Sequence, residues 1–166
     1  TDWKTTFTRA YSGIPQFWKM APKIAQAQGY SETKAGRRYK LSHWRDLPWA
    51  TSSSAINQPI QGSSADQKEL ALAVLITEMP VLEECLMLEL HDAIHLSISG
   101  DYSMRFLLKA NKILDDIDYG KYWGYKPPVA FPWEGSLGPN EGSKIEFGYD
   151  VNPSMTIDEF YKENKE

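Results

Sequence analysis

The alternating stretch at 86–99 constrains the fold more than any other part of the chain. Every second residue is apolar over 86–90 and again over 94–98. Alternation of this kind is typical of β-strands with one buried face. Because only residues 91–93 separate the two runs, the sequence predicts an antiparallel hairpin with a tight turn.

Asp92 occupies the predicted turn, where Gly or Asn is more usual because those residues tolerate unusual backbone angles. Apolar residues flank the turn, so we expect a carboxylate that is held rigidly and partly desolvated. Such a carboxylate suits a hard divalent cation such as Mg²⁺, which takes oxygen ligands and often binds through one or two carboxylates. Taken alone, Asp92 is more simply explained as a turn former.

Length and composition are those of an ordinary globular protein. The chain has 166 residues, of which 42% are hydrophobic and 24% are charged. The longest uncharged apolar run, 70–76, is far too short to cross a membrane. Cys85 is the only cysteine, which fits a reducing compartment. The sequence begins at Thr1 rather than Met, and we expect it to be a piece of a longer protein.

The net charge of −4 conceals an asymmetry between the two halves. Residues 1–80 carry ten Lys or Arg against six Asp or Glu, whereas residues 81–166 carry eight against sixteen. A basic half is suited to phosphates, and an acidic half to metal ligands or a solvated surface. The overall pI near 5.4 argues against a free-standing, purely electrostatic DNA-binding protein.

Helical periodicity dominates the first half of the chain. Apolar residues spaced three and four apart predict helix over 3–29, with a break near Pro15 and an end at Gly29. A second helix is predicted to begin at 48–54, to be interrupted by Pro59, and to continue strongly over 65–79.

The segment 30–45 reads as extended, with a turn at Ala35 and Gly36. Its cations are interspersed with aromatic rings, namely Lys34, Arg37, Arg38, Lys40, His43 and Arg45 with Tyr30, Tyr39 and Trp44. This mixture suits contacts with a nucleic-acid backbone, because phosphates attract charge and bases stack on flat rings. Taken alone, the segment is more simply explained as a solvated hairpin.

Three neutral amides lie around Pro59, at Asn57, Gln58 and Gln61. Residues three or four apart share a helix face, so two of these amides can point the same way. Amides both donate and accept hydrogen bonds, which suits the acceptors on the minor-groove edges of base pairs. Capping of a helix near a proline is the alternative. The small residues at 62–65 allow another backbone or a nucleic acid to approach closely.

The rest of the chain reads as a helix, a strand pair and a tail. An amphipathic helix is predicted at 102–117, followed by a loop at 119–128. Strands are predicted at 129–137 and 144–149, joined by a Gly-rich turn, and 156–165 reads as a short polar helix or a frayed tail.

Three aspartates, at positions 115, 116 and 118, close the predicted amphipathic helix. Their charge opposes the helix macrodipole, so we expect this end to fray or to be offset by a cation. A solvated face explains these aspartates better than metal binding does.

Several stretches, in order, resemble the C-terminal part of family A DNA polymerases, the group of bacterial polymerase I and phage replicative enzymes. Residues 29–38 resemble the family's Gly-Tyr-x-Glu-Thr-x-x-Gly-Arg-Arg segment, and residues 55–66 its Ala-Ile-Asn-x-Pro-x-Gln-Gly-Thr-Ala-Ala-Asp segment. Residues 90–93, Leu-His-Asp-Ala, stand where the family has its Val-His-Asp-Glu palm motif. Weaker likenesses at 7–13 and 138–140 extend the resemblance to about Asp2 to Tyr149.

The resemblance implies an α+β fold. An antiparallel palm sheet would be built on the central hairpin and the terminal strand pair, with helices packed on one face and a helical N-terminal portion. We expect a fingers and palm portion at 1–80, the palm sheet with its metal-binding hairpin at 81–149, and a tail at 150–166.

The resemblance also implies template-directed DNA synthesis by two-metal phosphoryl transfer with Mg²⁺, acting on primer-template DNA and deoxynucleotides. Asp92 matches the palm aspartate that binds the metals, and His91 matches a residue beside the primer terminus. Asn57 and Gln61 match residues that touch the minor groove. The pair at 37–38, Arg37 and Arg38, would contact the duplex backbone.

The chain departs from the family pattern at three positions. Ala93 replaces the glutamate after the palm aspartate, Ser53 replaces an arginine, and Glu141 replaces a tryptophan. The family's first metal-binding aspartate and its nucleotide-binding fingers helix are not seen in the sequence. One carboxylate cannot organise two metals, so we expect the chain alone to be inactive without an N-terminal portion, supplied in cis or as a separate subunit.

Two other functions stay open. A non-catalytic duplex-binding module that keeps the fold agrees with Ala93 and Ser53, whereas a single-subunit RNA polymerase shares the palm aspartate but fits the amides at 57–61 less well. For the DNA polymerase, which stays the leading prediction, we expect a cytoplasmic location in a bacterial cell or a phage-infected host.

Overall fold

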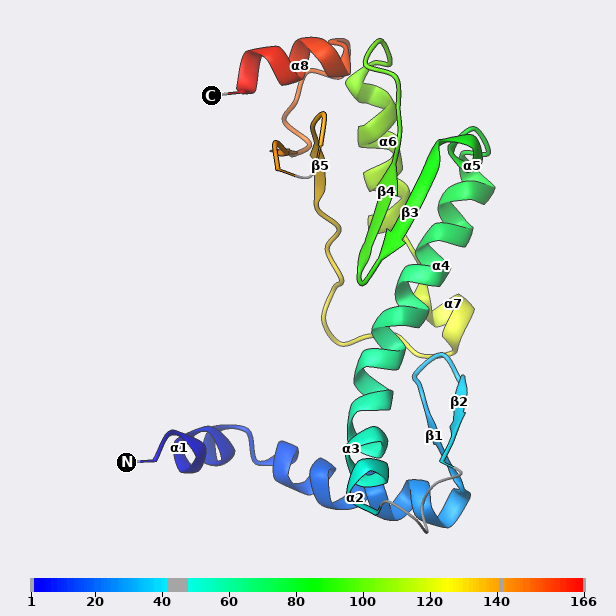
Figure 1. Cartoon of the computed structure of the whole chain (residues 1–166), viewed down its shortest axis with the longest axis vertical. Coiled ribbons are helices and arrows are strands. Elements are labelled where there is room, and N and C mark those ends of the chain that lie inside the picture. Colours follow the sequence, from blue (N-terminus) through cyan, green and yellow to red (C-terminus); the bar gives the residue numbers. More distant parts are fainter. Residues whose placement is uncertain (1, 42–47, 141, 166) are drawn as a thin grey trace. The chain divides into compact units, whose positions relative to one another are not determined.

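The computed structural model describes residues 2–41, 48–140 and 142–165. The predicted interface residues His43, Trp44 and Arg45, and the departure at Glu141, lie outside these ranges. The chain forms two compact units, one of Thr1–Gln67 with Gly120–Tyr125 and one of Lys68–Tyr119 with Lys126–Glu166. Helices and small antiparallel sheets alternate along it, so the predicted α+β class is confirmed (Figure 1).

Two helices begin the first unit, α1 at Trp3–Ala10 and α2 at Gly13–Gln28. The predicted break is confirmed, and Pro15 lies in the first turn of α2, where no backbone N–H is needed. Gly29 adopts a left-handed conformation with φ of 79° and ends α2 as predicted.

A small hairpin follows, with β1 at Tyr30–Glu32 paired antiparallel to β2 at Arg38–Lys40. Its connection contains Gly36 at φ of 87°, which confirms the predicted turn. Hairpin and helices share a core in which Ala25 of α2, Leu41 and Ala55 are buried together.

The second helical stretch is continuous but changes its winding. Helix α3 (Pro48–Asn57) leads into a π-helical segment, η1 (Gln58–Gly62), and then into α4 (Ser63–Glu78). In a regular α-helix the ring of Pro59 would clash with the carbonyl of Ala55 and remove one hydrogen bond. The wider π turn accommodates the ring, so the predicted interruption is a change of helix type rather than a break.

The predicted central hairpin is confirmed in the second unit. A short helix, α5 (Leu82–Cys85), leads into β3 (Leu86–Leu90), which pairs antiparallel with β4 (Ala93–Leu96). The register shifts between Leu86 and Leu88, where the pairing is irregular.

The predicted single palm sheet was wrong for the described residues. The strands of the terminal pair, β5 (Gly135–Leu137) and β6 (Ile145–Phe147), form their own two-stranded sheet, separate from the β3–β4 hairpin. The predicted strand at 129–137 is also shorter than expected, since β5 begins only at Gly135. Alternation in sequence identifies strands and their hairpin partners, but it does not state which hairpins share an edge.

Three further helices complete the chain: α6 (Met104–Asp115), α7 (Tyr119–Trp123) and α8 (Ile157–Asn164). Helix α7 falls where a loop was predicted, because five residues are too few to show a helical period. Thr156 caps α8 through a reciprocal capping box with Glu159, so this end of the chain is a formed helix.

The core of the second unit is apolar and mostly helical. Its fully buried large side chains are Leu75, Leu82 and Met104, with Leu114 and Phe160 nearly as buried. Among the helices that the structure describes, none combines the length and apolar character needed to cross a membrane.

The aspartates at the end of α6 are engaged by other groups. Lys112 Nζ lies 2.7 Å from Asp116 Oδ2, which confirms the expected offsetting cation. Asp115 accepts hydrogen bonds from the Tyr149 hydroxyl at 2.6 Å and the Trp133 backbone N–H at 3.3 Å. Burial of the hydroxyl raises the pKa of Tyr149 to about 12, and the hydrogen bond and charge of Asp115 add to the effect.

Tyr149 should therefore titrate late. Because its pKa is raised in the folded chain, the neutral hydroxyl contributes stability that is present below pH 10 and lost as the pH rises toward about 12. We expect ¹³C-labelled tyrosine NMR to show one ring signal with a pKa near 12, absent in Tyr149→Phe and lowered in Asp115→Asn. An unchanged titration in Asp115→Asn would contradict the assignment to this hydrogen bond.

Candidate functional site

The predicted site residues fall into two groups. Arg37, Arg38, Asn57 and Gln61 belong to the first compact unit, whereas the hairpin tip at 91–92 belongs to the second. Each group is built by different elements.

The tip of the β3–β4 hairpin consists of His91 and Asp92. His91 has φ of 53°, a left-handed conformation that is uncommon outside glycine and costs about 1 kcal/mol. Asp92 is exposed, so the predicted partial desolvation was wrong. The flanking Leu88 and Leu90 are themselves half exposed, and apolar neighbours in sequence therefore do not cover the carboxylate.

An ion pair holds β3 against helix α4. Lys68 Nζ lies 2.8 Å from Glu89 Oε2, and the two side chains are only 13% and 28% exposed. The hydrogen bond to Glu89 raises the pKa of Lys68, which keeps the pair ionised. Sequence analysis missed this contact, because a separation of about twenty residues leaves no periodic signal.

The hairpin tip alone does not form a metal centre. Within the ranges that the structure describes, no three His, Cys, Asp or Glu side chains lie close enough together to hold a metal ion. Asp92 offers one exposed carboxylate, which fits one oxygen ligand of a divalent cation whose other ligands come from elsewhere.

Two amides are free for a ligand at the π-helical segment. Asn57 ends α3 and Gln61 lies four residues later in η1, and both are exposed. Neither amide side chain is hydrogen-bonded to any residue in the described part of the chain. Gln58, the third predicted amide, is half-buried with its side chain close to Gly62.

Arg38 lies on strand β2 with its guanidinium over the ring of Tyr30, at 4.7 Å from the ring centroid. Its Nε also lies 2.8 Å from Glu32 Oε2 on the paired strand. The hydrogen bond to Glu32 raises the pKa of Arg38, and the charges of Tyr30 and Glu32 act in the same direction. The side chain is mostly exposed, so the ring and carboxylate orient a cation that faces solvent.

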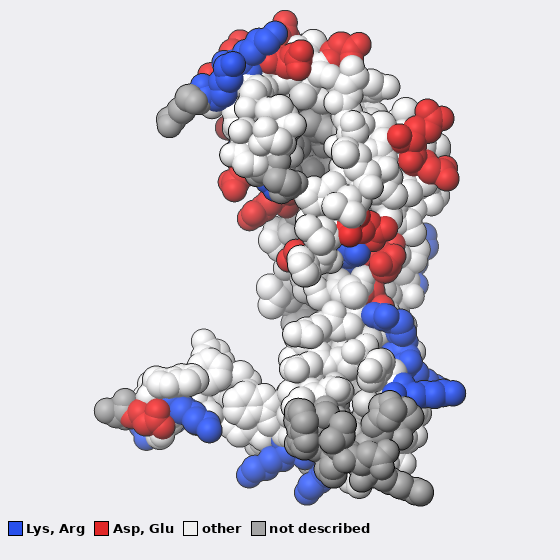
Figure 2. Space-filling model, viewed as in Figure 1, with Lys and Arg blue, Asp and Glu red and all other residues white. Residues whose placement is uncertain are grey.

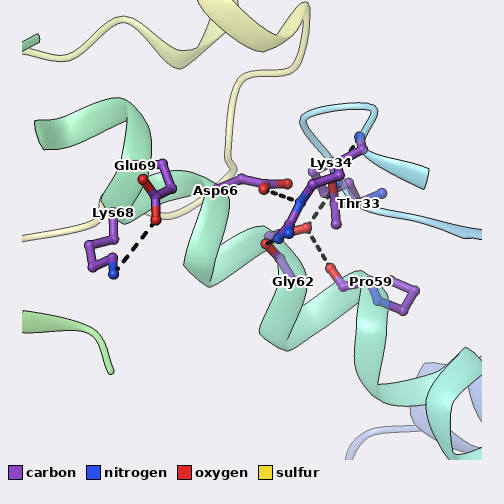
Figure 3. A network of polar contacts seen from close by, with 9 residues as sticks. Thr33, Lys34, Pro59, Gly62, Asp66, Lys68 and Glu69 are labelled. Carbon is purple, nitrogen blue, oxygen red and sulfur yellow. Dashed lines mark hydrogen bonds and ion pairs between the residues drawn. The ribbon is translucent and has the colours of Figure 1, made fainter. Parts of the chain in front are cut away.

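Arg37 is bound to the protein itself. Its Nε lies 2.6 Å from Asp66 Oδ1, and its Nη2 donates to the Gly62 carbonyl at 3.1 Å. Figure 3 draws this network, in which Thr33 and Lys34 of the hairpin face Gly62 and Asp66 of the helical segment. The sequence predicted a cation here but not its partners, which lie more than twenty residues along the chain.

Charge is distributed unevenly over the surface. On the face drawn in Figure 2, most Asp and Glu side chains lie over the elements of the second unit, and Lys and Arg lie mainly over the first unit and over α8. This agrees with the charge asymmetry of the sequence. Lys34 adds to the basic side of the hairpin, where its Nζ lies 5.1 Å from the ring centroid of Tyr125.

Comparison with known proteins finds similarity to DNA polymerases of bacteria and of a phage. The chain is 24% identical over 149 residues to a thermostable DNA polymerase I of Thermus thermophilus, covering 81% of this chain and 17% of that protein. It is 27% identical over 142 residues to a DNA-directed DNA polymerase of Pseudomonas phage M6, covering 79% and 20%. DNA polymerase I of Deinococcus radiodurans is 26% identical over 111 residues, covering 64% and 12%.

The chain thus spans a fifth or less of the length of these relatives. The model of the family described as DNA polymerase family A matches residues 1–118, which is well over half of the chain and includes every predicted site residue. The chain therefore belongs to DNA polymerase family A.

Proposed function

We propose that the chain is the C-terminal portion of a DNA-directed DNA polymerase that transfers nucleotides by a two-metal mechanism. The observation that carries the proposal is the family match across residues 1–118, which includes the exposed carboxylate at the hairpin tip. In this proposal, residues 1–80 form a fingers and palm portion, 81–149 form the palm part, and 150–166 form a tail.

Asp92 is assigned to the metals and His91 to the primer terminus. Two Mg²⁺ ions, when bound, stabilise the attacking and the leaving oxygens of the transfer. Asp92 would supply them with a carboxylate that no protein cation neutralises in the described chain. The ion pair of Lys68 with Glu89 ties the strand that leads to this tip to helix α4, which supports the presentation of the carboxylate from an ordered element of the fold.

An N-terminal portion is required for activity in this proposal. It would supply the second metal-binding aspartate and the nucleotide-binding helix, either in the same chain or as a separate subunit. Two observations support this requirement: Asp92 stands without further acidic ligands in the described residues, and the relatives are at least five times longer than the matched region.

The first unit is assigned to the DNA duplex. Asn57 and Gln61 would donate to the purine N3 and pyrimidine O2 acceptors that every correct base pair presents in the minor groove. Arg38, and the edge of Arg37 that faces away from Asp66, would contact the duplex backbone. We expect the complete enzyme to act on primer-template DNA and deoxynucleotides in the cytoplasm of a bacterium or a phage-infected host.

A non-catalytic duplex-binding module is the second candidate. It is favoured by Ala93, which stands where the family has an acid beside the metals, and by Ser53, which removes an arginine. Both residues are exposed, so packing does not account for either departure.

Replacing Asp92 should abolish DNA synthesis. In the longest natural protein that contains this chain, we expect Asp92→Ala to lower the rate of primer extension with Mg²⁺ at least about 100-fold, because it removes a charged group aimed at the reacting centre. Chelation of Mg²⁺ should have the same effect. Asp101→Ala, at another exposed turn of the same unit, serves as the matched control and should leave extension unchanged.

Extension that persists in Asp92→Ala would contradict the metal role. If the unmodified protein binds primer-template with salt-dependent affinity but does not extend it, the duplex-binding module becomes the better account.

Replacing the exposed amides should weaken the selection of correct base pairs. Asn57→Ala and Gln61→Ala each remove about 1 kcal/mol of hydrogen bonding to a correctly paired primer end, so we expect kcat/KM on matched ends to fall about fivefold. Mismatched ends, whose acceptors are displaced, should be affected less. Steady-state extension from matched and mismatched primers measures the ratio, with Gln26→Ala, an exposed amide on α2, as the control. Equal losses on both primers would refute the minor-groove assignment.

A further inference from the structure

We propose that Arg37 and Asp66 are positioning residues that hold the π-helical segment η1 in the shape that presents Asn57 and Gln61. We call their contacts, together with the bond from Lys34 to Ser63, the hairpin clamp. The clamp itself rests only on geometry, whereas its effect on base-pair selection rests on the proposed function.

The guanidinium of Arg37 spans the junction between η1 and α4. Its Nε lies 2.6 Å from Asp66 Oδ1 in the first turn of α4, and its Nη2 donates at 3.1 Å to the carbonyl of Gly62, the last residue of η1. One planar group with fixed donors thus contacts the backbone of η1 and a side chain of α4. Lysine, with a single charged nitrogen, cannot reproduce this fork.

A second bridge joins the hairpin to the start of the same segment. The Lys34 backbone N–H donates to Ser63 Oγ at 2.8 Å, and this hydroxyl donates to the Pro59 carbonyl at 2.5 Å. These contacts and the bond from Arg37 give the carbonyls of Pro59 and Gly62, at the two ends of the π turn, a side-chain donor each.

The hairpin also packs directly on the π turn. Gly62 is buried, and a Cβ placed on it would lie 2.7 Å from Thr33 Cγ2 and 2.7 Å from Gln58 Nε2. Thr33 is itself only 5% exposed, and its hydroxyl accepts from the Arg37 backbone N–H at 3.1 Å. Because Gly62 has no side chain, Thr33 can lie directly against the π turn, and this packing adds to the polar contacts of the clamp.

Asp66 is unsuited to touching DNA. Its side chain is only 10% exposed, and a carboxylate would repel phosphates. Its Oδ2 is buried and has no hydrogen-bond partner among the described residues, so Arg37 is its principal compensation. A buried carboxylate that loses its partner is strongly destabilising, and the pair therefore ties the hairpin firmly to α4.

Loss of the clamp contacts would change the orientation of Asn57 and Gln61, although neither residue belongs to the clamp. If η1 changed from π to α winding, the helical register between α3 and α4 would change. Each residue of change would rotate α3 by about 100° relative to α4. Asn57 and Gln61 would keep their four-residue spacing but would point in a new direction relative to α4 and the hairpin. Arg37 thus acts through the π turn, in addition to any contact of its free edge with the duplex.

The test uses the longest natural protein that contains this chain, with Asp66→Asn and Arg37→Lys as the clamp variants. Glu32→Gln is the matched control, because it removes a carboxylate from the same hairpin but breaks only the pair with Arg38. We expect amide hydrogen exchange at 58–63 to accelerate at least tenfold in both clamp variants and to stay unchanged in the control. Unchanged exchange in the clamp variants would overturn the clamp.

The second readout is the ratio of extension from matched and mismatched primers. We expect Asp66→Asn to lower this ratio no more than the double variant Asn57→Ala with Gln61→Ala does, and its addition to that double variant to lower the ratio no further, because the clamp acts through those two amides. Fully additive losses would overturn the positioning role. If the unmodified protein extends no primer, the proposed function fails, and the exchange measurement alone still decides whether the clamp exists.

Discussion

The contact between Arg37 and Asp66 is the interaction on which the first unit depends. It joins a three-residue strand pair, too small to be stable by itself, to a long helix through a short charge-assisted bond. The same guanidinium donates to the Gly62 carbonyl, so Arg37 joins the hairpin to the π turn as well as to α4. Pro59 in the π turn and Gly62, which allows the hairpin to approach, lie three residues apart.

A second ion pair has the corresponding place in the other unit. Lys68, two residues after Asp66 on α4, is paired with Glu89 on the strand that leads to the hairpin tip. The tip itself is open: His91 is held in a left-handed conformation and Asp92 is exposed. In the function that we propose, this exposed carboxylate is one ligand of a shared metal site. The hairpin alone forms no such site in the described chain.

The chain belongs to DNA polymerase family A. In the function that we propose, the exposed amides at 57 and 61 and the oriented cation at Arg38 contact nucleic acid, and the carboxylate at Asp92 binds metal. The departures at Ser53 and Ala93 lie on exposed positions, so they change the chemistry offered to a ligand rather than the packing.

Local patterns in the sequence determined helices α1 to α4 and α6, the turns at Gly29 and Gly36, and the central hairpin, because periodicity and backbone restrictions act between near neighbours. They did not reveal the short helix α7. Sequence order also sufficed to identify the family. The tertiary structure alone decided that Asp92 is exposed, that the two hairpins of the second unit form separate sheets, and that Arg37 binds Asp66 and Gly62. These features depend on contacts between residues far apart in the chain, and such contacts leave no periodic trace in the sequence.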